Sequence, residues 1–222
     1  MNIQIDNIIR SKRKTISLEI TSDAKIVIKA PHYVSINYLE DFIIRKKDWI
    51  IKKVNIIKER NQLKSKRIFS DKGKILFLGK DFDINFNHNS KRITLGEKLL
   101  IPIKYKCDTK KYVINWYKKQ ARIILNKKVF EIAQKFGFNY RSIRISDAKT
   151  RWGSCSGKNN LNFSWRIIMA PIQIIDYIII HELIHTEIKN HSREYWNKVV
   201  SICPNCKNYR KWLKENGHLL DL

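Results

Sequence analysis

The chain of 222 residues has few cysteines, few prolines and glycines, few acidic residues and no long uninterrupted hydrophobic run. Its four cysteines are too few for a fold that depends on a disulfide framework. With four prolines and seven glycines, the chain is neither collagen-like nor a Pro/Gly-rich linker. Hydrophobic residues make up 43% of it, which excludes a disordered chain and predicts a folded core.

The sequence also lacks a segment that could span or cross a membrane. The longest apolar stretch, residues 167–184, is interrupted by Pro171, Gln173 and Asp176. A membrane helix needs ~20 mostly apolar residues, so this stretch is too broken to be one. Residues 1–14 are basic without a following apolar run, which is unlike a secretory signal. We therefore expect no membrane contact, a cytoplasmic location and free thiols.

The shortage of acidic residues leaves a large positive charge. Asp and Glu number 20 against 45 Lys and Arg, so the formal net charge is +25. The excess is spread over both halves of the chain and forms no basic tail. Two explanations stay open: an Ile/Asn/Lys bias from A/T-rich codons, or a basic surface that contacts nucleic acid or another polyanion.

The hydrophobic pattern predicts short strands mixed with helices, without a regular βαβ rhythm, and hence an α+β fold. It predicts a β-rich N-terminal region, residues 1–107, with one amphipathic helix, and a helical region, residues 108–222, with a small antiparallel hairpin or sheet; the alternative is one continuous domain. The expected strands are 14–20, 25–30, several within 74–103, 143–152 and 161–168. The expected helices are 36–60, 108–136, 171–189, one after Ser192 and one over 209–215.

The most informative segment is His181-Glu182-Leu183-Ile184-His185. On a helix, positions i and i+4 differ by about 40° of rotation and ~6 Å of rise, so both imidazoles point the same way and can bind one divalent ion. Glu182 is placed to hydrogen-bond a metal-bound water and to take its proton. A catalytic zinc usually has a third protein ligand, and His191 is the best candidate if the helix ends near Asn190.

The competing interpretation is a helix with unliganded histidines. Residues 172–184 are mostly Ile and Leu, so such a helix would have to bury two imidazoles and a carboxylate. Burying those groups without partners costs free energy, which favours a metal site. The charged residues of 171–188 are all acidic (Asp176, Glu182 and Glu187), so the site is expected to lack positive charge.

Several motifs together resemble the YgjP-like metal-dependent hydrolases, which are zincin-type proteins related to the SprT and WLM metallopeptidases. The C-terminal resemblance covers about residues 140–217, and the N-terminal part is similar more loosely. The motifs are Lys149-Thr-Arg-Trp-Gly-Ser-Cys-Ser156, Leu161-Asn162, Trp165-Arg166, Asp176-Tyr177, His181-Glu-Leu-x-His185, Asn190-His-Ser192 and Trp196.

This resemblance implies one zinc ion per chain, held by His181, His185 and His191, with Glu182 as catalytic base. It also implies that Trp152, Gly153 and Ser154 lie beside the cleft, where an edge strand can bind an extended peptide. Labels in the family range from metallopeptidase to nucleotide (UTP) pyrophosphatase. The expected substrate is therefore a peptide or protein, or alternatively a nucleoside triphosphate; a third alternative is a nucleic-acid-associated protein whose zinc is chiefly structural.

Three other residue types are given structural interpretations. Cys203 and Cys206 have the spacing of half a zinc ribbon, but without a second pair they are expected to be free thiols. Tyr195 is expected to pack in the core. Asp176 lies five residues before His181, an unfavourable offset for orienting that ligand.

Overall fold

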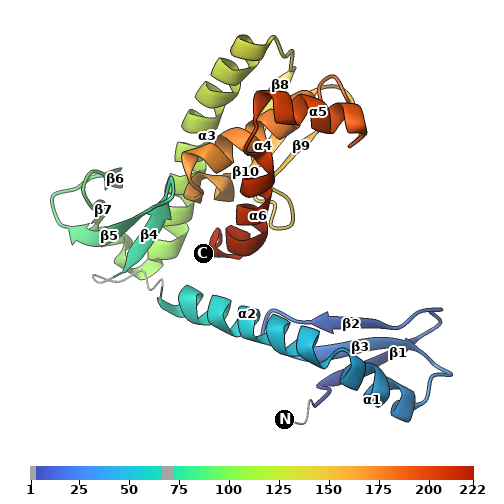
Figure 1. Cartoon of the computed structure of the whole chain (residues 1–222). Coiled ribbons are helices and arrows are strands. Elements are labelled where there is room, and N and C mark those ends of the chain that lie inside the picture. Colours follow the sequence, from blue (N-terminus) through green and yellow to red (C-terminus); the bar gives the residue numbers. More distant parts are fainter. Residues whose placement is uncertain (1–3, 67–72) are drawn as a thin grey trace. The chain divides into compact units, whose positions relative to one another are not determined.

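The computed structural model describes residues 4–66 and 73–222. The chain divides into two compact units, residues 1–66 and 67–222 (Figure 1). Together they form a mixed α+β structure with small sheets, as the sequence predicts.

The first unit is a small three-stranded sheet followed by two helices. The strands are β1 (Asn7–Ser11), β2 (Ser17–Ile20) and β3 (Ile26–Pro31). The order is β1-β3-β2, with β3 parallel to β1 and antiparallel to β2. The β2–β3 hairpin lies where the alternating pattern predicts it, whereas β1 lies outside the predicted strands.

The predicted helix over residues 36–60 is two helices, α1 (Ile36–Arg45) and α2 (Lys47–Lys66). Ser35 caps α1, accepting the N–H of Tyr38 at 3.3 Å. The N–H of Lys46 turns back to the carbonyl of Ile43 at 3.0 Å, which tightens the last turn and ends α1. The break lets residues on both sides of it enter one core. That core consists of Ile26, Ile28, Ala30, Leu39, Ile43 and Ile50.

The second unit begins with a four-stranded sheet of order β4-β5-β7-β6. Its strands are β4 (Lys74–Phe77), β5 (Lys80–Asn87), β6 (Thr94–Leu95) and β7 (Leu99–Pro102). The turn after β4 donates the N–H of Leu78 to the Ile168 carbonyl and the N–H of Gly79 to the Met169 carbonyl. Gly79 has φ +79°, and a Cβ there would lie 2.9 Å from Pro171. A glycine is therefore required at this close approach.

These strands share one core with the helices that follow them. Ile75, Phe77 and Leu99 are buried in the same cluster as Trp116 and Ile179. Because of this shared core, the two compact units divide between residues 66 and 67. The boundary that the sequence suggests is at residue 107.

The long helix α3 (Thr109–Phe136) follows a 3₁₀ turn, η1 (Ile103–Asp108), and lies against the core. Its bounds agree with the hydrophobic periodicity, and Gly137 ends it with φ +75°, the left-handed conformation typical of a glycine after a helix. The hydroxyl of Tyr117 donates to the carbonyl of Leu76 at 2.6 Å and so ties α3 to β4.

A second small sheet forms in the region where the sequence predicts an antiparallel hairpin. Its strands β8 (Ser142–Ser146), β9 (Gly153–Cys155) and β10 (Asn160–Ser164) have the order β8-β10-β9. The sequence predicts an antiparallel hairpin of 143–152 with 161–168, and its first strand is wrong. Strand β8, which lies within 143–152, pairs with β10 in parallel, and the antiparallel partner of β10 is β9, just after the predicted strand, so the sheet is mixed. The predicted strand over 143–152 breaks because Trp165 Nε1 donates to Asp147 and Ser164 Oγ to the Ala148 carbonyl.

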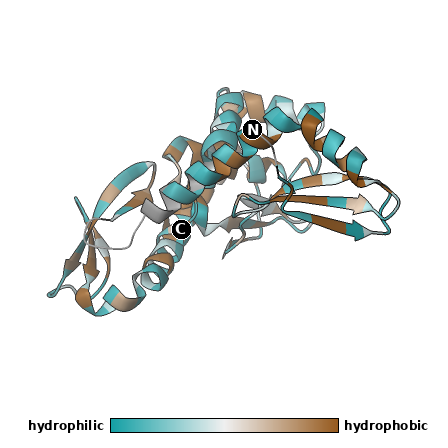
Figure 2. Cartoon of the chain, turned by 90° about the horizontal axis from the view of Figure 1, so that it is seen from below, coloured by the Kyte–Doolittle hydropathy of each residue, from teal (hydrophilic) through white to brown (hydrophobic). Residues whose placement is uncertain are grey.

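The remaining elements are η2 (Trp165–Met169), α4 (Ile172–Ile184), α5 (Arg193–Ile202), α6 (Cys206–Asn216) and η3 (Gly217–Leu219). Helix α4 ends at Ile184, five residues before the predicted end, and most of it is buried. No described helix is long and apolar enough to cross a membrane; Figure 2 shows hydrophobic and hydrophilic residues interspersed along the helices.

Candidate metal centre

Three histidines converge at the C-terminal end of α4. His181 lies in the last turn of α4 and His185 caps it, whereas His191 lies in the loop before α5. The His191 Nε2 atom lies 3.2 Å from His185 Nε2 and 3.3 Å from His181 Nε2. Three imidazole nitrogens that face one point are a donor set suited to one divalent ion of the zinc type.

The early end of α4 brings the third histidine to this point. The N–H of Glu187 bonds back to the Ile184 carbonyl at 3.0 Å, an i→i−3 bond that tightens the last turn where α4 ends. The Nδ1 of His185 lies 2.9 Å from the Ile188 carbonyl, to which its N–H donates. Since one ring nitrogen carries the proton, Nε2 keeps its lone pair for a metal.

Tyr195 orients the His181 ring in a similar way. The Tyr195 hydroxyl donates to the backbone carbonyl of His181 at 3.0 Å, which leaves its oxygen to accept the His181 Nδ1–H at 2.6 Å. Burial, together with the charge of His185 and of His191, lowers the pKa of His181 to about 3. His181 is therefore neutral at pH 7 with its Nε2 lone pair directed at the other histidines.

Sequence reasoning assigned Tyr195 to core packing, and its side chain is indeed fully buried. Its contact with His181 was missed because the two residues are 14 positions apart. The signal available in the sequence was Ser192, whose Oγ accepts the Tyr195 N–H at 3.3 Å and starts α5. That cap fixes the orientation of the first turn of α5, and hence of Tyr195.

Glu182 is 5% exposed beside the three histidines. Burial raises its pKa to about 7, against the opposing charge of Arg151. A carboxyl group with a pKa close to neutrality can both accept and return a proton at physiological pH.

The segment predicted to line the cleft lies directly against Glu182. A Cβ on Gly153 would lie 2.6 Å from both Cγ and Oε1 of Glu182, so only a glycine allows β9 to approach this closely. Trp152, just before β9, lies near the C-terminal helix, where a Cβ on Gly217 would be 3.0 Å from its indole. Ser154 pairs with Asn162 of β10.

Strand β9 is an edge strand whose backbone polarity can be deduced from its register. The Ser164 N–H donates to the Trp152 carbonyl and the Ser156 N–H to the Asn160 carbonyl, both at 2.9 Å. Because backbone groups alternate along an antiparallel strand, the N–H and C=O of Gly153 and Cys155 point away from β10. These groups form the outer edge of the sheet beside Glu182.

The expectation that the site lacks positive charge is wrong. Arg151 acts on Glu182, Lys189 on His185, and Arg210 on His181 strongly enough to affect their pKa values. The expectation was based on residues 171–188, and all three cations lie outside that segment. Lys189 follows it directly, whereas Arg151 and Arg210 lie far from it in sequence.

The other residues weighed from the sequence have structural partners. Asp176 pairs with Lys128 at 2.7 Å, and not with a ligand histidine. Cys203 and Cys206 are buried free thiols between α5 and α6, where the Cys206 N–H donates to the Cys203 carbonyl at 3.0 Å.

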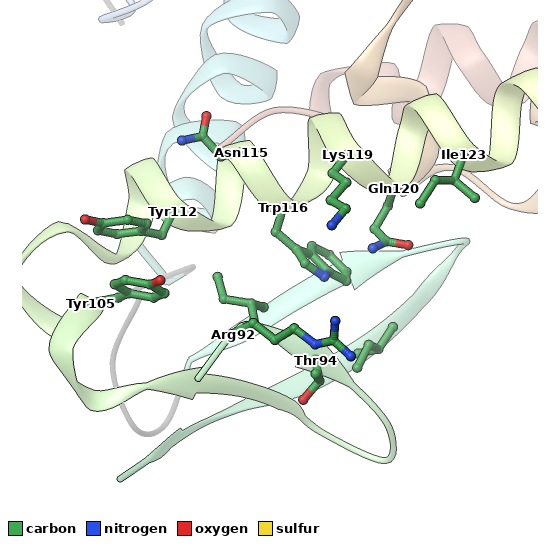
Figure 3. A pocket seen from close by; sticks show the side chains of 11 residues that line it. Arg92, Thr94, Tyr105, Tyr112, Asn115, Trp116, Lys119, Gln120 and Ile123 are labelled. Atoms are coloured by element: carbon green, nitrogen blue, oxygen red, sulfur yellow. The ribbon is translucent and has the colours of Figure 1, made fainter. Parts of the chain in front are cut away.

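A separate hollow of about 690 Å³ lies between α3 and the sheet of β5, β7 and β6. Figure 3 shows Arg92 and Lys119 at this hollow, with Trp116 between them and the stacked rings of Tyr105 and Tyr112 at one end. The two tyrosine ring centroids are 3.8 Å apart. None of the three histidines lines this hollow.

Comparison with known proteins gives a family match and a similar solved structure. No curated protein matches the chain significantly. Among solved structures, the metallopeptidase zymogen jannalysin of Methanocaldococcus jannaschii is 26% identical, over 39% of this chain and 90% of its own, with a TM-score of 0.36. The model of the YgjP-like metallopeptidase domain matches residues 14–216, which is nearly the whole chain. A metal-dependent hydrolase is the activity that this match supports. The chain thus belongs to the YgjP-like metallopeptidase domain family.

Proposed function

We propose that this protein is a zinc-dependent peptidase that uses His181, His185 and His191 as metal ligands and Glu182 as general base. The proposal rests on the convergence of the three histidine Nε2 atoms beside the buried Glu182 carboxyl group. The Nε2 of His191 lies 3.2 Å from that of His185 and 3.3 Å from that of His181. Neutral imidazoles with their second nitrogen hydrogen-bonded are typical zinc ligands.

The chain's own residues supply the proton transfers. A zinc ion, when bound, supplies Lewis acidity that activates water and polarises the scissile carbonyl. The Glu182 carboxylate accepts a proton from the attacking water and returns it to the departing amine nitrogen. Burial raises the pKa of this carboxyl group toward neutrality, which suits a group that must both accept and return a proton.

The outer edge of β9 supplies a place for the substrate. An extended peptide that adds to this edge would pair with the N–H and C=O groups of Gly153 and Cys155. Gly153 contacts Glu182, so a peptide bond held there lies next to the base. Of the predicted cleft residues, this arrangement gives Gly153 a role through its backbone, whereas the backbone groups of Trp152 and Ser154 face β10.

The test is the substitution Glu182→Gln, which keeps the size of the side chain and removes its basicity. We expect zinc content and thermal unfolding to stay close to wild type while hydrolysis of unfolded polypeptide falls by 100-fold or more, about the contribution of a general base. Undiminished hydrolysis by the variant would remove Glu182 from the mechanism.

A second candidate keeps the site and replaces the peptide by a nucleoside triphosphate such as UTP. The cations beside the site favour it, because phosphates would be attracted to them. Assaying UTP and unfolded polypeptide side by side, with Glu182→Gln as the blank, distinguishes the two substrates.

The third candidate is a nucleic-acid-associated protein whose zinc is chiefly structural. The hollow beside α3 is the surface best suited to bind nucleic acid. Arg92 and Lys119 line it, and Tyr105 and Tyr112 offer aromatic faces on which a base could stack. Binding of single-stranded DNA that weakens steeply with salt, and is lost in Arg92→Gln, would support this contact. An absence of binding at low salt would leave codon bias as the origin of the net charge.

A further inference from the structure

Three basic residues from different segments lie near the histidine site, and they bear on which substrate the proposed peptidase takes. Arg210, on α6, lies with its guanidinium carbon 4.4 Å from the centroid of the Trp196 ring. The Trp196 ring stacks in turn on His191, with centroids 5.6 Å apart and planes at 21°. Guanidinium, indole and imidazole thus form a stack that places a positive charge beside the third ligand.

Arg151 and Lys189 lie on the β9 side of the site. Arg151 is exposed and precedes Trp152 and Gly153, the residue whose backbone touches Glu182. Lys189 follows His185 by four residues, and its Nζ donates to the Asn159 side chain and, at 3.4 Å, to the Ser156 carbonyl. These bonds fix Lys189 at the β9–β10 turn, close to where an added strand would leave the edge.

The acids of α4 and of the turn after it do not cancel those charges. Asp176 of α4 is paired with Lys128, and Glu187 is paired with Lys198. Glu182 is buried and is engaged as the proposed base. The rim of the site is therefore a positively charged surface beside a peptide-binding edge, which complements negative charge on a substrate.

We propose that Arg151, Lys189 and Arg210 form a cationic rim that selects polypeptide substrates with acidic side chains on both sides of the scissile bond. The inference rests on the proposed peptidase function and specifies its substrate class. Arg151 would meet the acidic residues of the segment paired with β9, and Arg210 those beyond the histidines. Lys189, held by the turn, contributes charge rather than a direct contact.

The test measures peptide binding without turnover. The full-length Glu182→Gln protein, loaded with zinc, is titrated into fluorescent peptides of equal length that are acidic, neutral or basic, at physiological salt. We expect the acidic peptide to bind most tightly. Adding Arg151→Gln and Arg210→Gln should weaken it about 10-fold, with little change for the neutral peptide.

A matched control is needed because the net charge of +25 attracts any acidic peptide. The double variant Arg122→Gln and Lys127→Gln also removes two positive charges, but from α3. Arg122 lines a different hollow, beside Asp147 and Trp165. Arg210→Lys restores the charge and should recover part of the affinity, which separates charge from any change in the packing of Trp196. Equal weakening by the rim and α3 variants, or equal binding of acidic and neutral peptides, would overturn the inference.

The hydrolysis assay separates this inference from the proposed function. If wild-type protein cleaves neutral and acidic peptides at equal rates, the peptidase stands and the selective rim is wrong. If no peptide is cleaved but acidic peptide binding still depends on the rim, the rim stands and the peptidase is wrong. UTP affinity that depends on Arg151 and Arg210, with peptide affinity that does not, would contradict the polypeptide substrate.

Discussion

At the scale of single residues, the chemistry of the site depends on where each imidazole keeps its proton. His185 donates through Nδ1 to the Ile188 carbonyl, and His181 donates through Nδ1 to the Tyr195 hydroxyl oxygen. Both contacts leave Nε2 free, and both hold the ring plane in place. Tyr195 therefore contacts two of the ligand histidines, because its ring also stacks on His185 with centroids 4.5 Å apart.

Replacing Tyr195 by Phe keeps the ring and removes the hydroxyl. We expect the zinc dissociation constant to rise about 10-fold or more, the usual effect of losing a group that orients a ligand histidine. Competition with a chromophoric chelator measures it. Tyr177→Phe is the matched control, since it removes a hydroxyl from a ring 6.1 Å from that of His181. An unchanged zinc affinity in Tyr195→Phe would mean that the hydroxyl has no part in holding the metal.

At the scale of elements, the site is built where a buried helix ends beside a strand edge. Helix α4 supplies His181 and Glu182, and β9 approaches Glu182 through Gly153. This close approach makes the glycine a structural requirement of the site.

Gly153→Ala should therefore impair the proposed reaction without removing the metal. The new Cβ would lie 2.6 Å from Glu182, so either the carboxyl group or β9 must move. We expect turnover to fall at least about 10-fold, and stability by about 1–3 kcal/mol, as for an overpacked site. Gly157→Ala in the same hairpin is the control, because a Cβ there meets nothing within 4 Å. Equal activity in both variants would show that the contact is unimportant.

Local signals explain which elements the sequence predicts well. Periodicity predicts α3, and the i, i+4 spacing of His181 and His185 predicts their common face. Long-range contacts explain what the sequence does not predict. The parallel pairing of β8 joins it to residues 18 positions further along the chain, and the role of Tyr195 depends on the turn after α4. Such contacts join residues far apart in sequence, so no local pattern records them.

At the scale of the whole molecule, one ion-pair network ties the chain end of the second unit to its core. Arg166 is buried and donates to Asp147, and also to Asp221 at 3.0 Å. Lys118 of α3 lies 3.1 Å from Asp147. Burial alone would raise the pKa of Asp147, but the bonds from Arg166, Trp165 and Lys118 outweigh it and hold the pKa well below its usual value.

This network predicts a stability that depends on acid pH. A carboxyl group whose pKa is lower in the folded than in the unfolded chain stabilises the fold above the unfolded value of 3.8, and that contribution is lost as the pH falls further. Asp147→Asn should cost about 1 kcal/mol at pH 7, since 55% of the side chain is exposed to screening. That is about 2–4 °C in melting temperature.

The difference between wild type and Asp147→Asn should shrink as the pH is lowered below about 4, as followed by thermal unfolding. Asp83→Asn is the matched control, because its pair with Lys74 spans 3.8 Å and is exposed on both sides. A constant difference down to the lowest pH at which the protein folds would assign the effect to packing.

The central claim is that His181, His185 and His191 together hold one zinc ion. Metal analysis of the full-length protein after zinc loading and desalting tests it most directly. We predict about one zinc per chain in wild type and in Glu182→Gln, and loss of that zinc in His185→Ala and His191→Ala with unchanged circular dichroism. Wild-type protein that is folded and takes up no zinc, or a His185→Ala variant that retains a full equivalent, would contradict the account.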